Sequence, residues 1–199
     1  MKSSKICTII LVLMMMAPVS ALADIISIGA QVGWSIPKGG VFESFGGEKS
    51  AKGGVHVDAD VLYHLSFVPL VGDRLAAGVT YNGSLLFGAN INNADIGLYG
   101  LSLFGAKAYF KGLPGPISPY VALSAGVTRL STPEITMGDV VISEKQKVSS
   151  FGLRPEIGVK LSKFTVSAGY IVPVNYHLEG GNSTAGVFQI SIGMRFGFL

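Results

Sequence analysis

The sequence contains one cysteine, Cys7, and only 14% of its 199 residues are charged. Cys7 lies in an N-terminal segment that we expect to be removed, so the remaining chain has no thiol for a disulfide, a nucleophile or a metal site. After Ala23, no segment approaches the about 20 consecutive apolar residues that a membrane-spanning helix needs. There is also no phosphate-binding glycine loop, because the 27 glycines follow strand alternation and turns.

The first 23 residues have the parts of a secretory signal peptide. Two lysines precede a largely apolar run over 6–16, and Ala21 and Ala23 are small residues at the positions that a signal peptidase reads. The run is too short to span about 30 Å of hydrocarbon as a helix. We therefore predict cleavage after Ala23, which divides the chain into a signal peptide over 1–23 and a single domain over 24–199.

The charge balance gives no indication of a nucleic-acid partner. The chain has 15 basic and 12 acidic residues, and removal of Lys2 and Lys5 with the signal peptide leaves 13 basic residues against 12 acidic ones. The composition is nevertheless 49% apolar. An apolar, exported chain without a spanning helix is expected to cross a membrane as strands, in which lipid-facing and interior residues alternate.

Eight segments alternate between apolar and small or polar residues with a period of two. They span 26–34, 55–65, 75–81, 96–110, 120–130, 148–161, 164–172 and 188–198. Most approach the about 9–11 residues that a tilted strand needs to cross a bilayer. Because the number is even and long and short connections alternate, we predict an all-β, antiparallel, up-and-down transmembrane barrel. Both ends should face the periplasm and the long loops the outside.

Three features of the pattern carry local predictions. The alternation changes phase near Gly105, which favours a bulge. Pro155 has no N–H for a ladder, so we expect a bulge or a broken ladder bond there. The connection over 173–184 is predicted to be a long external loop. Aromatic residues near the strand ends are typical of interfacial girdles, and they are Trp34, Tyr63, Tyr99, Tyr109, Phe110, Tyr120, Phe164, Tyr170 and Phe196.

A soluble β-sandwich or lipocalin-like barrel would also alternate, but its outward residues should be polar. Here the apolar face is the more continuous one, and the charges lie on the face that carries the glycines. This arrangement favours lipid outside and a polar lumen inside.

The face predicted to line the lumen carries charges of both signs. Its members are His56, Asp58, Asp60, His64, Lys107, Arg154, Glu156, Lys160 and Arg195. Such groups can form a proton path or a catalytic site. Eight strands, however, leave an interior just wide enough for side chains, so we expect opposite charges to pair as a structural network that fills it. Residues on one strand form a row with about 7 Å per step, which disfavours a metal site. We expect no catalytic residue, metal or cofactor.

The last segment resembles the C-terminal strand signal that the outer-membrane barrel assembly machinery reads. Its alternating residues are Phe188, Ile190, Ile192, Met194, Phe196 and Phe198, and Leu199 follows them. The stretch over 119–127, PYVALSAGV, resembles the fifth strand of small eight-stranded barrels of the OmpA, OmpX and OmpW type. The resemblance implies an outer-membrane location in a Gram-negative cell, contact with membrane lipid and lipopolysaccharide, and assembly by that machinery with periplasmic chaperones.

Three functions remain open. The first is a structural or surface-interaction barrel with a plugged polar lumen, acting through polar loops over 37–50 and 131–147 whose ligand is unknown. The second, implied by the resemblance to OmpW-type proteins, is a narrow channel for small apolar molecules that opens sideways into the membrane. The third is a lipid-modifying enzyme, but His177 is the only external histidine and no catalytic motif surrounds it. We favour the first.

Overall fold

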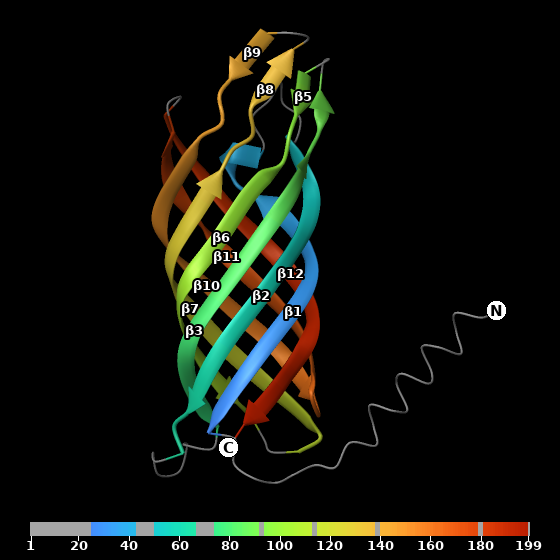
Figure 1. The fold of residues 1–199 in the computed structure, drawn as a ribbon, viewed down its shortest axis with the longest axis vertical. Coiled ribbons are helices and arrows are strands. Elements are labelled where there is room, and N and C mark those ends of the chain that lie inside the picture. The colour runs from blue at the N-terminus through green and yellow to red at the C-terminus, as the bar shows by residue number, and fades with distance from the viewer. Residues whose placement is uncertain are drawn as a thin grey trace, which may run out of the picture.

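The computed structural model describes residues 25–42, 50–66, 74–91, 94–112, 115–137, 140–178 and 181–198. The predicted signal peptide and Leu199 lie outside these ranges. Eight long strands form the main body: β1 Ile26–Lys38, β2 Ala51–His64, β3 Leu75–Gly88, β6 Tyr99–Lys111, β7 Ile117–Ser131, β10 Lys147–Leu161, β11 Phe164–Leu178 and β12 Gly181–Phe198. They close into one antiparallel barrel in the order β1-β12-β11-β10-β7-β6-β3-β2 (Figure 1). The predicted eight-stranded barrel is confirmed.

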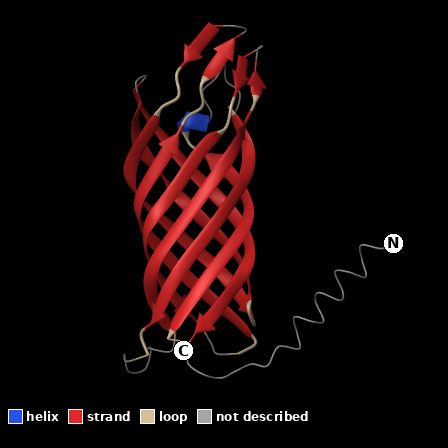
Figure 2. Cartoon of the chain, in the orientation of Figure 1, coloured by secondary structure: helices blue, strands red, loops and turns tan. Residues whose placement is uncertain are grey.

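The two ends of the barrel differ in their connections. The first and last described strands begin and end at the same end, where the turn over 162–163 joins two strands directly (Figure 2). At the opposite end, which we call the loop end, β1 and β2 are joined over 39–50, β3 and β6 over 89–98, and β7 and β10 over 132–146. This arrangement matches a barrel whose ends face the periplasm and whose long loops face outward.

The strands extend further at the loop end than the alternation predicted. The prediction of a long loop over 173–184 is wrong, because β11 and β12 stay paired up to Leu178 and Gly181. A bulge between Ile171 and Val174, next to Pro173, shifts the register of this pair. The extra residue exchanges the inward and outward positions beyond it. A strict two-residue alternation therefore stops at the bulge, although the strand continues to Leu178.

The loop end carries structure of its own. A short 3-10 helix, η1 Gly40–Phe42, follows β1. Four short strands, β4 Asn90–Ile91, β5 Ala94–Ile96, β8 Ile135–Met137 and β9 Val140–Ser143, form a second sheet beyond the barrel rim (Figure 1). Because β5 pairs with β8, this sheet joins the β3–β6 connection to the β7–β10 connection.

Strand β6 contains no bulge, contrary to the prediction at Gly105. Its pairing with β3 and with β7 is continuous, and Gly105 lies directly opposite Gly126. The inward side chains change from Lys107 and Tyr109 to Leu101 and Leu103 along the same face. The apparent change of phase is therefore a change in the polarity of the lumen.

The ladder between β10 and β11 is short. Within the described strands it runs only from Glu156–Gly169 to Leu161–Phe164, whereas β10 pairs with β7 along its whole length. It ends next to Pro155, which has no N–H to donate. The expected broken ladder is thus present on the β11 side, while pairing with β7 continues through Pro155 without a bulge.

The outer wall of the barrel is apolar and exposed. Large hydrophobic side chains on every long strand point outward, and Val32, Phe104, Ile117 and Phe151 are between 58% and 66% exposed. Soluble proteins rarely leave an apolar surface of this extent open to water, whereas a lipid-facing wall has this character. No helix in the described part of the chain is long and apolar enough to cross a membrane.

The predicted aromatic girdle is only partly correct. Trp34, Tyr63, Phe110 and Phe196 face outward with 40% to 51% of their surface exposed. Three of the tyrosines assigned to the girdle lie inside the barrel instead, each at most 4% exposed: Tyr99, Tyr109 and Tyr120. Closure of the barrel decides which face of a strand is interior, and proximity to a strand end does not.

Candidate functional site

A cluster of six charged side chains occupies the middle of the barrel interior. It contains three cations and three carboxylates from four strands, each at most 3% exposed: Asp58, Asp60, Lys107, Arg154, Glu156 and Arg195. We call this group the charge network. The formal charges of its members sum to zero, so each buried cation can be balanced by a buried carboxylate.

Lys107 lies at the centre of the charge network. Its Nζ atom donates to Asp60 Oδ2 at 2.9 Å and to Glu156 Oε2 at 3.0 Å, and it lies 4.0 Å from Asp58 Oδ1. The three carboxylates come from β2 and β10, and Lys107 comes from β6 between them in chain order. One ammonium group thus links strands that are not neighbours in the barrel wall.

The two arginines complete the charge network on either side. Arg154 Nη1 lies 3.0 Å from Asp58 Oδ2 and 2.5 Å from Glu156 Oε2. Arg195 binds Asp60 with both terminal nitrogens at 2.7 Å, the forked geometry that matches a carboxylate. Each carboxylate therefore has at least two cationic neighbours.

Neutral polar side chains surround the charge network and extend it to further strands. Gln189 accepts a hydrogen bond from Arg154 Nε at 2.7 Å and donates to Asn82 Oδ1 at 2.7 Å. Tyr120 donates to Glu156 Oε1 at 2.8 Å. Ser167 donates to Gln31 Oε1 at 2.7 Å. All eight barrel strands thereby contribute to one set of buried polar groups.

Several of these polar residues could not be assigned from the sequence. Asn82 lies just beyond the alternating segment over 75–81, and the place of Tyr120 near a strand end predicts an interfacial residue. Gln31 and Gln189 did lie on the predicted lumen face. A search for uncharged amide side chains on that face would have found them.

Glycines make room for the two arginines. A Cβ atom on Gly29 would come within 2.7 Å of Asp60 Oδ1 and 2.8 Å of Arg195 Nη2. A Cβ atom on Gly169 would come within 2.7 Å of Arg154 Nη2. The guanidinium groups of Arg195 and Arg154 therefore pack directly against the backbone of Gly29 and Gly169, where a larger residue would clash.

We expect Gly169→Ala to lower the free energy of unfolding by about 1–3 kcal/mol, because the added methyl group displaces a side chain that is already fixed by several partners. Gly100→Ala is the matched control, since its Cβ would meet only Ser131 at an ordinary 3.5 Å. Urea unfolding of both variants in detergent micelles measures the difference. Equal stability of the two variants would show that Arg154 can move aside freely.

The charge network is covered by apolar side chains at both ends. Toward the periplasmic end, Tyr109 and Tyr120 pack with ring centroids 4.8 Å apart, and Arg195 lies 5.0 Å from the Tyr109 centroid. Leu62, Ala76 and Ala122 complete this layer. Buried residues of the loop-end cluster, including Leu86, Leu101, Leu103 and Leu130, cover the other side.

Helix η1 closes the loop end with Phe42. This side chain is 1% exposed and packs edge-on against Tyr99 with centroids 5.4 Å apart. The segment is held by hydrogen bonds from Ser50 N to Phe42 O at 2.9 Å and from Gly40 N to Thr184 Oγ1 at 3.2 Å. The segment over 40–42 therefore lies in the mouth of the barrel.

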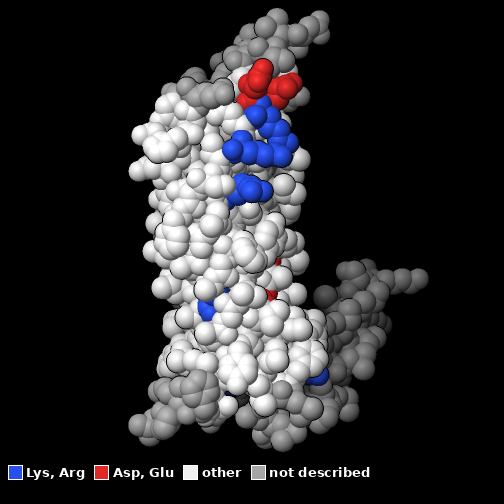
Figure 3. All heavy atoms as spheres, turned by 60° about the vertical axis from the view of Figure 1, so that its left-hand side comes forward, with Lys and Arg blue, Asp and Glu red and all other residues white. Residues whose placement is uncertain are grey.

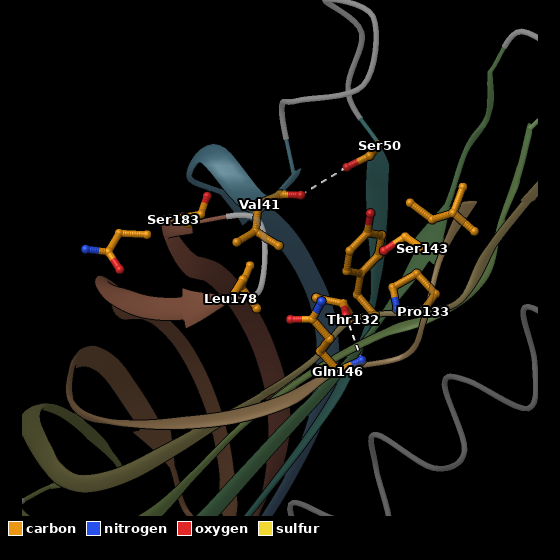
Figure 4. Close-up of a pocket in the computed structure, with 12 residues that line it drawn as sticks. Val41, Ser50, Thr132, Pro133, Ser143, Gln146, Leu178 and Ser183 are labelled. Carbon is orange, nitrogen blue, oxygen red and sulfur yellow. Dashed lines mark hydrogen bonds between the residues drawn. The ribbon is translucent and has the colours of Figure 1, made fainter. Parts of the chain in front are cut away.

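Beside η1, whose Val41 is part of the lining, the mouth holds a cavity of about 360 Å³ (Figure 4). Its lining mixes hydroxyl, amide and apolar groups, including Ser50, Tyr99, Thr132, Gln146 and Leu178. Among the described residues, no group of three or more His, Cys, Asp or Glu side chains could hold a metal ion together. None of the described residues that line the cavity carries a formal charge.

The remaining predicted lumen residues lie at different levels of the barrel. His56 is 2% exposed and its Nε2 lies 2.8 Å from Ser191 Oγ. His64 is half-buried near the periplasmic end, with Nε2 3.2 Å from Ser27 Oγ. Lys160 is half-buried, four residues further toward that end than Glu156. The external His177 is exposed, and its Nδ1 contacts Asn182 Oδ1 across the hairpin.

Comparisons with known proteins support the fold. The sequence matches no protein-family model and none of the curated proteins. Among solved structures, Neisserial surface protein A is 18% identical with a TM-score of 0.57, covering 87% of this chain and 97% of that one. Ail from Yersinia pestis, in complex with the heparin analogue sucrose octasulfate, is 14% identical with a TM-score of 0.51, covering 86% and 99%. OprG from Pseudomonas aeruginosa is 12% identical with a TM-score of 0.50, covering 88% and 98%.

These likenesses show the fold, which is that of eight-stranded outer-membrane barrels. An apolar outer wall around a polar interior is the surface that such a barrel presents to lipid. The fold and the wall together place the chain in the outer membrane, as predicted.

Proposed function

We propose that this protein is a closed outer-membrane barrel that acts through its outer surface and external loops rather than by conducting solutes through its lumen. The charge network is the observation that carries this proposal. Six buried, mutually paired charges cross the lumen from four strands, and apolar layers cover them on both sides. An ion entering this interior would have to break pairs that are shielded from water.

The external surface supports an interaction role. The sheet formed by β4, β5, β8 and β9 extends past the rim and joins two of the connections. Ail, one of the similar barrels, is an attachment invasion locus protein whose structure was solved with a heparin analogue. We infer an interaction role for the loop end here, with the mouth cavity as a site for a small uncharged group. This role requires no catalytic residue.

Planar-bilayer recording tests closure of the lumen. We expect the folded protein, verified by the gel shift of unboiled samples, to produce no reproducible conductance steps, because the charge network leaves no open path. A general porin inserted into the same bilayers is the positive control. Reproducible steps from the folded protein would contradict the proposal and favour a channel.

A second function, a lateral channel for small apolar molecules, is favoured by one observation. The β10–β11 ladder covers six residue pairs, whereas β10 pairs with β7 over fifteen. The unpaired part of the boundary between β10 and β11 includes Ile171 and Tyr176 of β11, which belong to the apolar loop-end cluster. Vesicles without ion conductance that nevertheless take up an apolar dye faster than protein-free vesicles would favour this route over a purely structural role.

A further inference from the structure

The outer face of β6, β7 and β10 carries a row of very exposed apolar side chains near the loop end. Phe104, Val127 and Phe151 lie directly opposite one another on the three adjacent strands. Their exposed fractions are 62%, 57% and 66%. We call these three residues the apolar row, and on an outer-membrane barrel they face the acyl chains of the outer leaflet.

The next outward row is polar and basic. Two residues further along the strands, about 7 Å toward the loop end, Arg129 lies opposite Ser102 on β6 and Ser149 on β10. Lys147 lies on the same face of β10, diagonal to Arg129, and Lys145 precedes it by two residues, just before β10 begins. We call Arg129, Lys145 and Lys147 the cation cluster.

The cation cluster is exposed, and no salt bridge to a described residue neutralises it. All three side chains are exposed, and Figure 3 shows basic side chains gathered on one face near the loop end, next to acidic ones beyond them. Within the described residues, none of the three forms a salt bridge or a side-chain hydrogen bond. Among the described residues, the exposed carboxylates Glu134 and Glu144 lie in the connection between β7 and β10.

This order of groups matches the order of groups in a membrane leaflet. In a leaflet, hydrocarbon would lie against the apolar row, and the phosphates of the lipid headgroups would lie beside the basic row next to it. A guanidinium group binds phosphate oxygens in forked geometry, and a lysine nearby adds a point charge. Ser102 and Ser149 beside Arg129 offer hydroxyl donors and are too small to cover it.

We propose that the cation cluster and the apolar row form one binding site for lipopolysaccharide, with lipid A phosphates on Arg129 and Lys147 and acyl chains on Phe104, Val127 and Phe151. The site lies on the outer wall, on one side of the barrel only. It deepens the proposed function by naming a lipid partner. It rests on the outer-membrane placement, and it does not depend on closure of the lumen.

The test measures binding of lipid A to the exported protein, extracted from outer membranes and washed free of lipid in detergent. Native mass spectrometry gives the bound fraction at several concentrations of lipid A. The double variant Arg129→Gln/Lys147→Gln is expected to bind at least about tenfold more weakly, because each basic residue near an anionic lipid surface contributes appreciably. Dephosphorylated lipid A should bind the unaltered protein as weakly as lipid A binds this variant.

A matched variant distinguishes a specific site from general basicity. Lys38→Gln/Lys52→Gln removes two exposed charges at the loop end of β1 and β2, on the opposite side of the barrel. It should bind lipid A within about twofold of the unaltered protein. Inorganic phosphate at the lipid concentration should not compete. An unaffected Arg129/Lys147 variant, an equal loss in the Lys38/Lys52 variant, or full competition by phosphate would overturn the proposal. The presence or absence of conductance steps in the planar-bilayer experiment does not affect the interpretation of these lipid A binding measurements.

Discussion

Replacing Arg154 with alanine is expected to lower the free energy of unfolding by about 3–5 kcal/mol, since it leaves buried carboxylates without their partner. Arg154 is fully buried and lies within 3.0 Å of both Asp58 and Glu156. Without it, Lys107 is the only cation among the described residues that pairs with the buried carboxylates of Asp58 and Glu156. Urea unfolding in micelles, followed through the fluorescence of Trp34, the single tryptophan, measures the loss.

A charge-balanced double variant separates pairing from simple loss of packing. Arg154→Met/Glu156→Gln removes one charge of each sign and keeps most of the side-chain volume. We expect it to be more stable than the sum of the two single variants predicts, because no uncompensated charge remains. Lys38→Ala on the exposed outer face of β1 is the control and should change stability by less than about 0.5 kcal/mol.

The same variants should still be exported and inserted, because the predicted assembly signal on β12 and the outer wall are unaltered. An Arg154→Ala protein as stable as the unaltered barrel would mean that the ion pairs contribute nothing to closure. The proposal of a lumen filled by paired charges would then fail.

Replacing Phe42 with alanine is expected to lower the free energy of unfolding by about 3 kcal/mol, because the aromatic ring fills the mouth of the barrel and its loss leaves a cavity. Phe42 is 1% exposed and packs against Tyr99 within the apolar loop-end cluster. The short helix η1 has few backbone bonds of its own, so the burial of Phe42 helps to attach it to the barrel. The same unfolding experiment measures the loss.

Phe87→Ala is the matched control for Phe42→Ala. Phe87 lies at the same end of the barrel but faces outward on β3 and is 45% exposed. It should therefore cost less than Phe42→Ala. Equal losses in the two variants would mean that Phe42 is held no more tightly than a wall residue, and that η1 does not close the mouth.

The sequence alone identified the barrel because successive residues of a transmembrane strand face lipid and lumen in turn, so each strand shows its own alternation of apolar and small or polar residues. Each wall residue faces either lipid or lumen, so the alternation is readable without knowing which strands are neighbours. The charges on the lumen face were visible for the same reason: Asp58 and Asp60 on one strand, and Arg154 and Glu156 on another, are two residues apart and must share a face.

Local alternation could not resolve the interior where its polarity changes. Inside a small barrel, apolar and polar side chains are both tolerated, since closely packed neighbours replace solvent and lipid alike. The inward-facing Leu101 and Leu103 therefore suggested a change of phase that is absent, and the inward-facing Tyr109 and Tyr120 suggested residues of an interfacial girdle. The bulge near Pro173 reversed the period in β11 and made a paired strand resemble a loop.

The sequence by itself determined the eight strands, the lipid-facing wall and the set of charges assigned to the lumen, because each depends on residues close together in the chain. Only the tertiary structure decided which charges pair, where the glycines make room for arginines, and that Phe42 enters the mouth. It alone also placed Arg129 and Lys147 on neighbouring strands above the apolar row. These features depend on strand order and register, which closure of the whole barrel sets.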